Sequence, residues 1–106
     1  MFVAINYISC QESYKSRFEE LFSTRAGAID TMPGFQHMYV LKPNDQQSEY
    51  LIVSHWESED NFKAWTSSEA FIQGHRRGFQ DIEEAVKNGQ EPPMKSSFKT
   101  YEILTR

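Results

Sequence analysis

Hydrophobic and polar residues alternate with a period of two at the start of the chain. Residues 2–9, FVAINYIS, are rich in β-branched and aromatic side chains and end at a polar cluster, which predicts a β-strand. The alternation places one set of side chains on one face of this strand: Phe2, Ala4, Asn6 and Ile8. Asn6 is therefore predicted to lie on an otherwise apolar face.

The next elements follow from the same patterns. Apolar residues recur at helical spacing over residues 13–29, and Met32-Pro33-Gly34 should end that helix. Residues 35–42 and 50–57 predict two strands joined by the polar turn 43–49, which favours a hairpin. Residues 58–65 open a helical segment, the serines at 67 and 68 can cap a second helix to residue 87, and 98–104 predict a last strand after a loop over 88–97.

The resulting order, β-α-β-β-α-β, is that of a ferredoxin-like α+β domain, with an antiparallel sheet and helices on one face. We expect a single domain over residues 1–106. One sheet face then has no helix over it, and aromatic residues make up 14% of the chain. Together these features predict a homodimer that covers this face.

Composition narrows the choice of partners. The net charge of −4 and the pI of about 5.3 argue against nucleic acid and against an anionic membrane surface. No apolar run approaches the roughly 18 residues of a membrane span, and the N-terminus lacks the basic region of a secretory peptide. With a single cysteine, Cys10, the chain cannot form an internal disulfide. We therefore expect a cytoplasmic protein.

One histidine stands out within the last predicted helix. At about 100° per residue, His75 shares an apolar face with Phe71 and Phe79, and Gly74 and Gly78 flank it. Each glycine inside a helix costs about 1 kcal/mol relative to alanine. One interpretation is a core histidine bonded to a backbone carbonyl, with a helix break at Gly78. The other is that bare backbone lets a flat ligand, such as a porphyrin with iron bound by the imidazole, lie beside the ring.

Two further residues admit two interpretations each. Trp65 lies ten residues before His75, and a tryptophan in this setting is most simply a core residue. A buried Asn6 amide must find partners or cost a few kcal/mol. A bond from this amide to nearby backbone at a bulge would satisfy it, and a pocket beside the strand would give it a different role.

Taken together, Asn6, the segment FKAWTSSEAF with Trp65, and GHRRGF with His75 resemble the Asn/Trp/His triad of the IsdG-type heme-degrading monooxygenases. These belong to the antibiotic biosynthesis monooxygenase (ABM) superfamily of dimeric ferredoxin-like α/β barrels. The segment TRAGAIDTMPGF resembles the family's helix-to-strand junction, and IVSHWESEDNFKAW resembles its third strand and following helix. The Pro-Gly-Phe and Trp-Glu-Ser runs within them support only the fold. Gly74 stands where a small residue such as alanine is expected.

The resemblance implies a role for each residue. His75 would be the axial ligand of heme iron, Trp65 would press the porphyrin out of plane, and Asn6 would donate its amide to the dioxygen that heme activates. Heme would be cofactor and substrate at once, and O2 and an external electron donor, a reductase or a small reductant, would open its ring and release iron. Arg25 and Arg76 could meet the heme propionates, although a solvated charge explains either equally well.

Two other functions remain open at this point. A cofactor-independent ABM-type monooxygenase acting on an aromatic or quinol substrate would use Asn6 and Trp65 to orient that substrate. A non-catalytic heme-binding dimer would use His75 alone. A strong Soret band on adding hemin, followed by its loss with reductant and oxygen, separates the three.

Overall fold

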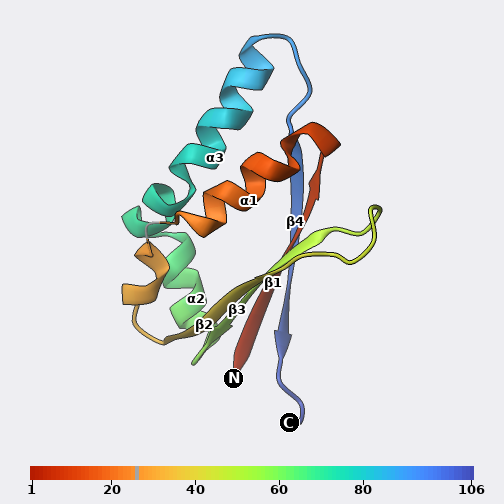
Figure 1. Cartoon of the computed structure of the whole chain (residues 1–106). Helices are drawn as coiled ribbons and strands as arrows, with labels where there is room; N and C mark the ends of the chain where they lie inside the picture. The colour runs from red at the N-terminus through yellow and green to blue at the C-terminus, as the bar shows by residue number, and fades with distance from the viewer. Residues whose placement is uncertain (26) are drawn as a thin grey trace.

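The computed structural model describes residues 1–25 and 27–106 (Figure 1). Its elements, in chain order, are β1 (Phe2–Cys10), η1 (Glu12–Tyr14), α1 (Lys15–Ser23), η2 (Ala28–Thr31), β2 (Phe35–Leu41), β3 (Tyr50–Trp56), α2 (Glu59–Thr66), α3 (Glu69–Lys87) and β4 (Met94–Glu102). Here η marks a short 3₁₀ helix.

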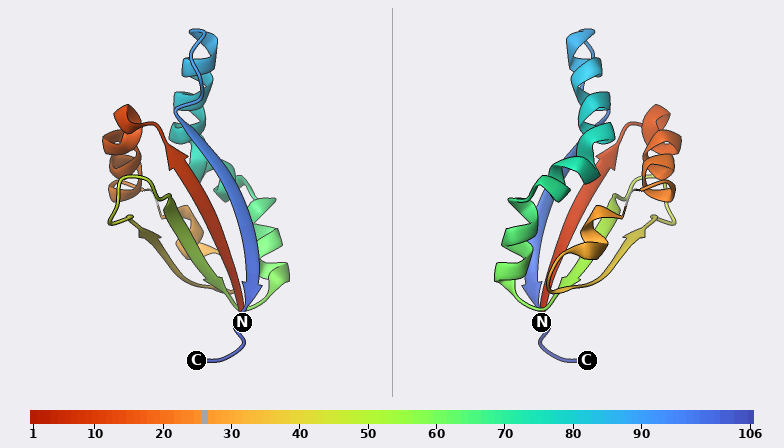
Figure 2. Two further views of the ribbon diagram at one scale, coloured as in Figure 1. Left: turned by 90° about the vertical axis from the view of Figure 1, so that its right-hand side faces the viewer. Right: turned by 90° about the vertical axis from the view of Figure 1, so that its left-hand side faces the viewer.

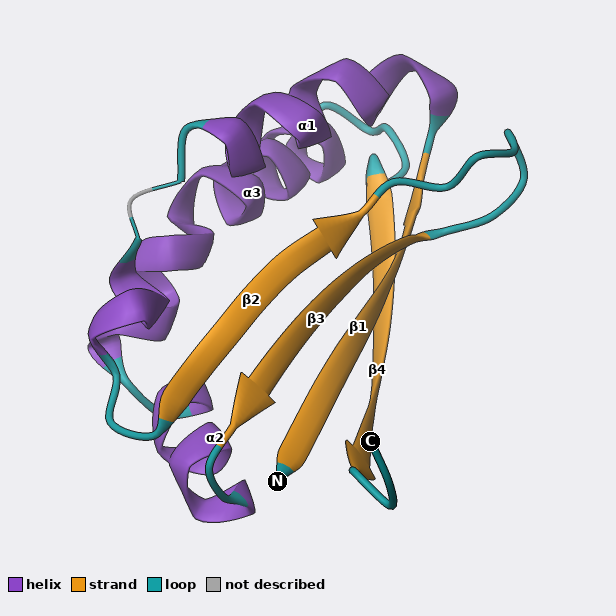
Figure 3. Ribbon diagram, turned by 60° about the horizontal axis from the view of Figure 1, so that its bottom comes forward, coloured by secondary structure: helices purple, strands orange, loops and turns teal. Residues whose placement is uncertain are grey.

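The four strands form one antiparallel sheet in the order β2-β3-β1-β4. The three α-helices lie on one side of this sheet (Figure 3), and the two side views show α3 extending beyond its upper end (Figure 2). The predicted ferredoxin-like α+β fold is confirmed. None of the helices among the described residues is long and apolar enough to cross a membrane.

Two hydrophobic clusters fill the space between helices and sheet. The first consists of Phe2, Ala4, Ile29, Trp56 and Trp65. The second consists of Ile8, Tyr14, Phe18, Leu21 and Tyr50. On β1, Asn6 lies between Ala4 of the first cluster and Ile8 of the second, on the same face as both. The strand therefore presents a polar side chain where the apolar core divides.

Two predicted boundaries were wrong. The helix expected over residues 13–29 ends at Ser23, and Gly27 adopts a left-handed φ of 74° before η2 begins; Ala26, also in that range, lies outside the described residues. The last strand begins at Met94 rather than residue 98, because Cys10 and its neighbours on β1 pair with Met94 and Lys95. Pairing with β1 therefore sets the start of β4, whereas α1 has already ended before the backbone turn at Gly27.

The opposite face of the sheet carries a mixed apolar surface. Val3 and Ile5 of β1 pair with His55 and Val53 of β3, and Tyr39 and Tyr101 extend the surface on either side. Tyr39 is 45% exposed and Tyr101 43% exposed. Within the described ranges, no helix covers this face.

Candidate functional site

His75 projects from α3, whose first turn is capped by Ser68; the Ser68 side chain accepts a hydrogen bond from the backbone N–H of Phe71. The Nδ1 atom of His75 lies 2.7 Å from the carbonyl oxygen of Phe71. Because a carbonyl can only accept, Nδ1 must carry the proton. Whenever the ring is neutral, this leaves Nε2 unprotonated, with a free lone pair.

Aromatic rings surround the imidazole. The ring centroid of Phe71 lies 4.1 Å from that of His75, and Phe79 stacks on the other side at 5.5 Å. The indole of Trp65 lies 6.2 Å away. His75 itself is half-buried, and its neighbours Ile72 and Phe79 on α3 are each 48% exposed. The imidazole thus sits beside apolar surface that remains open to a ligand.

The two glycines beside His75 have different surroundings. A Cβ on Gly74 would lie 3.6 Å from the Trp65 indole, and a Cβ on Gly78 would lie 3.2 Å from Met94 Cε. The missing Cβ at Gly78 therefore lets α3 approach Met94 closely, whereas a Cβ on Gly74 would make only an ordinary contact with Trp65. The helix break considered at Gly78 was wrong, since α3 runs without interruption from Glu69 to Lys87.

Trp65 lies near the end of α2 and is 6% exposed. Its indole stacks on Trp56 at 6.4 Å and meets the edge of Phe71 at 5.3 Å. In this conformation Trp65 is a core residue behind the imidazole. A ligand that contacts its face has to displace the rings that cover it.

Asn6 is half-buried on the helix-facing side of β1, between Ile52 of β3 and Phe98 of β4. β1 pairs with both neighbours in continuous register, so the bulge considered for this position is absent between residues 2 and 8. Among the described residues, no hydrogen bond holds the Asn6 amide. Its two N–H donors and both oxygen lone pairs are therefore available to a ligand or to water.

The arginines near the site differ in their ion-pair and hydrogen-bond partners. Arg25 Nη2 lies 3.2 Å from Asp30 Oδ1 and is one-third exposed. Arg76 is exposed and forms no ion pair within the described part of the chain. Arg77 donates to oxygens at the end of α1, a contact that no local sequence pattern could have revealed. The structure therefore leaves Arg76 as the cation with the most freedom to meet an anion.

The remaining histidines lie on the other side of the sheet. The rings of His37 and His55 are 5.9 Å apart, and the Tyr39 hydroxyl lies 3.1 Å from His55 Nε2. Burial lowers the pKa of His55, and the charges of His37 and Arg106 lower it further. Across the described residues, no three His, Cys, Asp or Glu side chains gather as metal ligands. His75 is thus a single imidazole on its face.

Two open grooves, of about 520 and 610 Å³, lie elsewhere: one between Tyr14 and the end of α3, the other between Met1 and Glu59. Neither includes Asn6, Trp65 or His75. A ring bound between α3 and the sheet would therefore occupy neither groove.

Comparison with known proteins shows the family of this chain. A model of the antibiotic biosynthesis monooxygenase family matches residues 1–77. The chain belongs to this family. The match spans β1, on which Asn6 lies, and the first half of α3, which carries His75.

Particular family members resemble the chain more closely. The mycobilin-producing heme oxygenase of Mycobacterium tuberculosis is 36% identical over 76 residues, which are 70% of this chain and 72% of that protein. The structure of the heme degrader MhuD from the same organism, with two hemes bound in its active site, superposes with a TM-score of 0.74 at 28% identity over 100% of this chain and 98% of that one. A MhuD variant with manganese protoporphyrin IX gives 0.76 at 25% identity, over 100% and 97%.

More distant members share the fold alone. The cofactor-independent oxygenase SnoaB from Streptomyces nogalater is 16% identical, with a TM-score of 0.71 over 99% of this chain and 94% of that one. Such a likeness supports the ABM fold and says nothing of the substrate. The site residues must therefore decide between the functions.

Proposed function

We propose that this protein is a heme-degrading monooxygenase that binds heme through His75 and opens the porphyrin ring with O2 and an external electron donor. The observation that carries the proposal is the His75 tautomer. Its Nδ1 proton is donated to Phe71, 2.7 Å away, which leaves Nε2 as a lone-pair donor on an apolar, partly open face. Similarity to the mycobacterial heme oxygenase supports the same function.

The residues present fit a heme. Heme iron takes an axial ligand from a neutral imidazole whose other nitrogen is held by a carbonyl or carboxylate. His75 and the Phe71 carbonyl form such a pair. The half-exposed Ile72 and Phe79 beside it offer the apolar contact that a macrocycle needs. No cluster of protein ligands in the described chain competes as a metal centre.

Each site residue then has a task. Bound heme supplies the iron that activates dioxygen for attack on the ring itself. Asn6 offers an amide donor from the sheet, where it can direct the attack towards one edge of the ring. Trp65 would contact the macrocycle once the rings that now cover the indole are displaced. Arg76 and, less freely, Arg25 provide cations for the propionates.

The oligomeric state is inferred from the sheet face that no helix of the described chain covers. We propose a cytoplasmic homodimer in which the uncovered sheet faces pack together. Tyr39, Leu41 and Tyr101 are 43–45% exposed there, and a second copy would bury this apolar surface. Each subunit would hold its own His75, so that the dimer carries two sites.

Hemin titration tests the proposal. We expect a strong Soret band in the parent and in His37→Ala, which changes a histidine on the opposite face, and its loss in His75→Ala. Aerobic addition of a reductant should then bleach the band as the ring opens and iron is released. A parent protein that gives no Soret band would support a cofactor-independent monooxygenase instead. Stable heme without bleaching would indicate a heme-binding dimer.

A further inference from the structure

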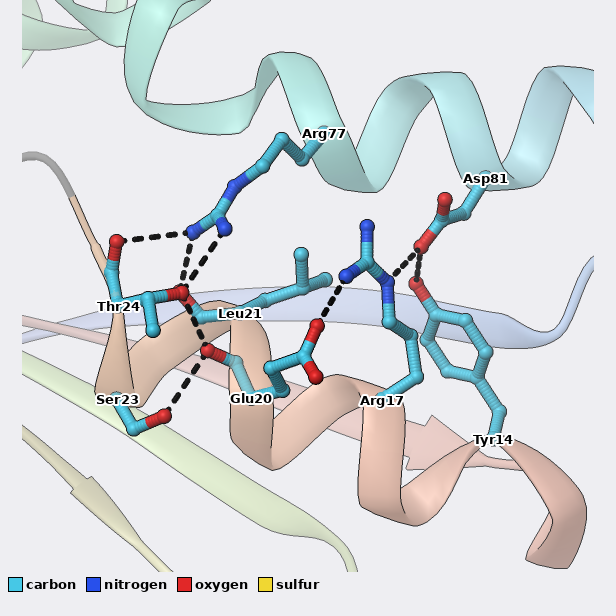
Figure 4. Close-up of polar contacts among 8 residues, drawn as sticks. All are labelled: Tyr14, Arg17, Glu20, Leu21, Ser23, Thr24, Arg77 and Asp81. Atoms are coloured by element: carbon cyan, nitrogen blue, oxygen red, sulfur yellow. Dashed lines mark hydrogen bonds and ion pairs between the residues drawn. The ribbon is translucent and has the colours of Figure 1, made fainter.

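Arg77 joins α3 to the end of α1 through three hydrogen bonds (Figure 4). Its Nη1 donates to Thr24 Oγ1 at 2.9 Å, and its Nη2 donates to the carbonyls of Leu21 at 2.9 Å and Thr24 at 3.1 Å. The last carbonyls of a helix have no partner within it and form the negative end of its dipole. The planar guanidinium therefore satisfies oxygens that α1 leaves free, in a geometry that an ammonium cannot reproduce.

A second link lies one turn further along α3. Asp81 accepts a hydrogen bond from the Tyr14 hydroxyl at 2.7 Å and another from Arg17 Nε at 2.9 Å. Burial alone would raise the pKa of the Asp81 carboxyl, but these two bonds and the charges of Arg17 and Arg77 outweigh it and hold that pKa below its ordinary value. Two charged contacts thus hold α3 against α1 on one side.

These contacts lie on the side of α3 away from the imidazole. At 100° per residue, Arg77 projects about 160° around the helix from His75. The bond from His75 to Phe71 lies entirely within α3, so it fixes the imidazole relative to its own helix and moves with it. Only contacts from outside α3 can fix the direction of the imidazole relative to the sheet.

Arg77 contacts the end of α1, and α1 continues the chain from β1, the strand that carries Asn6. β1 leads through η1 directly into α1, so the chain from Phe2 to Thr24 carries both Asn6 and the acceptors of Arg77. Resting on the proposed function, we propose that Arg77 is a positioning residue. By tying α3 to the end of α1, it sets the rotation of His75 towards Asn6, and thereby the placement of the heme between them.

The first arm of the test needs no heme. Residual dipolar couplings of α3 amides and NOEs of the His75 ring would be compared in the apo forms of the parent, Arg77→Met, Thr24→Val and a control, Lys87→Met. The control removes a cation from the same helix outside the contact with α1. We expect α3 to rotate relative to the sheet in Arg77→Met, less in Thr24→Val, which loses only one acceptor, and not in the control. Unchanged couplings in Arg77→Met would overturn the proposal.

The second arm uses hemin. We expect Arg77→Met to bind hemin about tenfold more weakly, with a shifted ferric spectrum, and to give a mixture of ring-opened isomers, whereas Lys87→Met stays within about twofold of the parent. A lower melting temperature with unchanged affinity, spectrum and products would show that Arg77 is merely structural and would also overturn the proposal. If hemin does not bind the parent through His75, the proposed function fails, while the apo comparison still decides whether Arg77 orients His75.

Because Arg77 is exposed, its bonds contribute modestly to folding, so the methionine variant should remain folded. Thr24→Val is milder still, since Thr24 is exposed and loses a hydroxyl alone. An Arg77→Met variant that does not fold would leave Thr24→Val to decide, and couplings identical to the parent in that variant would then count against the proposal.

Discussion

Phe98 lies directly opposite Asn6 in the β1–β4 ladder, and 63% of its surface is exposed. Its ring lies 6.2 Å from that of Phe62 on α2. A porphyrin on this side of the sheet would cover Phe98, and complete burial of such a ring is worth about 1.5–3 kcal/mol. We expect Phe98→Ala to weaken hemin binding by roughly tenfold and to change folding stability by less than about 0.5 kcal/mol. Leu104→Ala, at a residue that is 96% exposed, is the control for both titrations.

Asn6→Ala separates a structural amide from a catalytic one. No hydrogen bond in the described structure depends on this amide, so we expect the variant to melt close to the parent rather than to lose the 1–3 kcal/mol of an orphaned buried partner. Hemin should bind nearly normally, and bleaching with reductant and oxygen should slow sharply. Bleaching at the parental rate would remove Asn6 from the mechanism, and failure to fold would return it to a structural role.

The two glycines of α3 provide a matched pair. Alanine at position 74 meets Trp65 at an ordinary contact distance of 3.6 Å, whereas at 78 it meets Met94 Cε at a tight 3.2 Å. Alanine gains about 1 kcal/mol over glycine inside a helix. We therefore expect Gly74→Ala to raise the free energy of unfolding by about 0.5–1 kcal/mol and Gly78→Ala to gain less or to lose. Urea denaturation of both variants measures the difference; an equal gain would contradict it.

Acid should weaken the contact between α1 and α3. The pKa of Asp81 lies below its ordinary 3.8 in the folded protein, so the unfolded chain takes up the proton first as the pH falls. The contribution of Asp81 to stability is therefore complete above its unfolded pKa and is lost as the pH falls through the lower, folded value. We expect Asp81→Asn to show a shallower loss of stability between about pH 5 and 3 than the parent. Parallel curves of melting temperature against pH would refute this.

The uncovered sheet face should hold two subunits together. Leu41 is 45% exposed on β2 and belongs to this face. We expect the parent to sediment as a dimer and Leu41→Lys to shift it towards monomer, because a charge buried without a partner is costly. Lys42→Ala, at a residue on the other face of the same strand end, serves as the control. A parent that remains monomeric at every concentration would disprove the assembly.

Most of the architecture could be predicted because its signals are local. The alternation in β1 and the period of α3 are each contained within one element. Ser58 caps α2, and Ser68, one of the two serines expected to cap the second helix, caps α3. The end of α1 could not be predicted, since Leu21 and Ala28 keep a helical spacing although Gly27 turns the chain. The start of β4 depends on pairing between Cys10 and Met94, which are 84 residues apart in sequence (94 − 10).

The candidate site divides in the same way. His75 and its aromatic neighbours lie at helical spacing on one helix, so their shared face could be predicted from periodicity. The partner of Nδ1 could not be identified, because any backbone carbonyl could have served. The roles of Gly74, Gly78 and Arg77 depend on residues of other elements, and no spacing within α3 indicates them.

The side chains of Ile72, Phe79 and Phe98 are exposed to solvent. Whatever occupies that surface must displace solvent from it, so its binding should carry a negative change in heat capacity. The binding enthalpy should therefore become more favourable as the temperature rises, and calorimetry at several temperatures would report how much of the apolar surface each ligand covers.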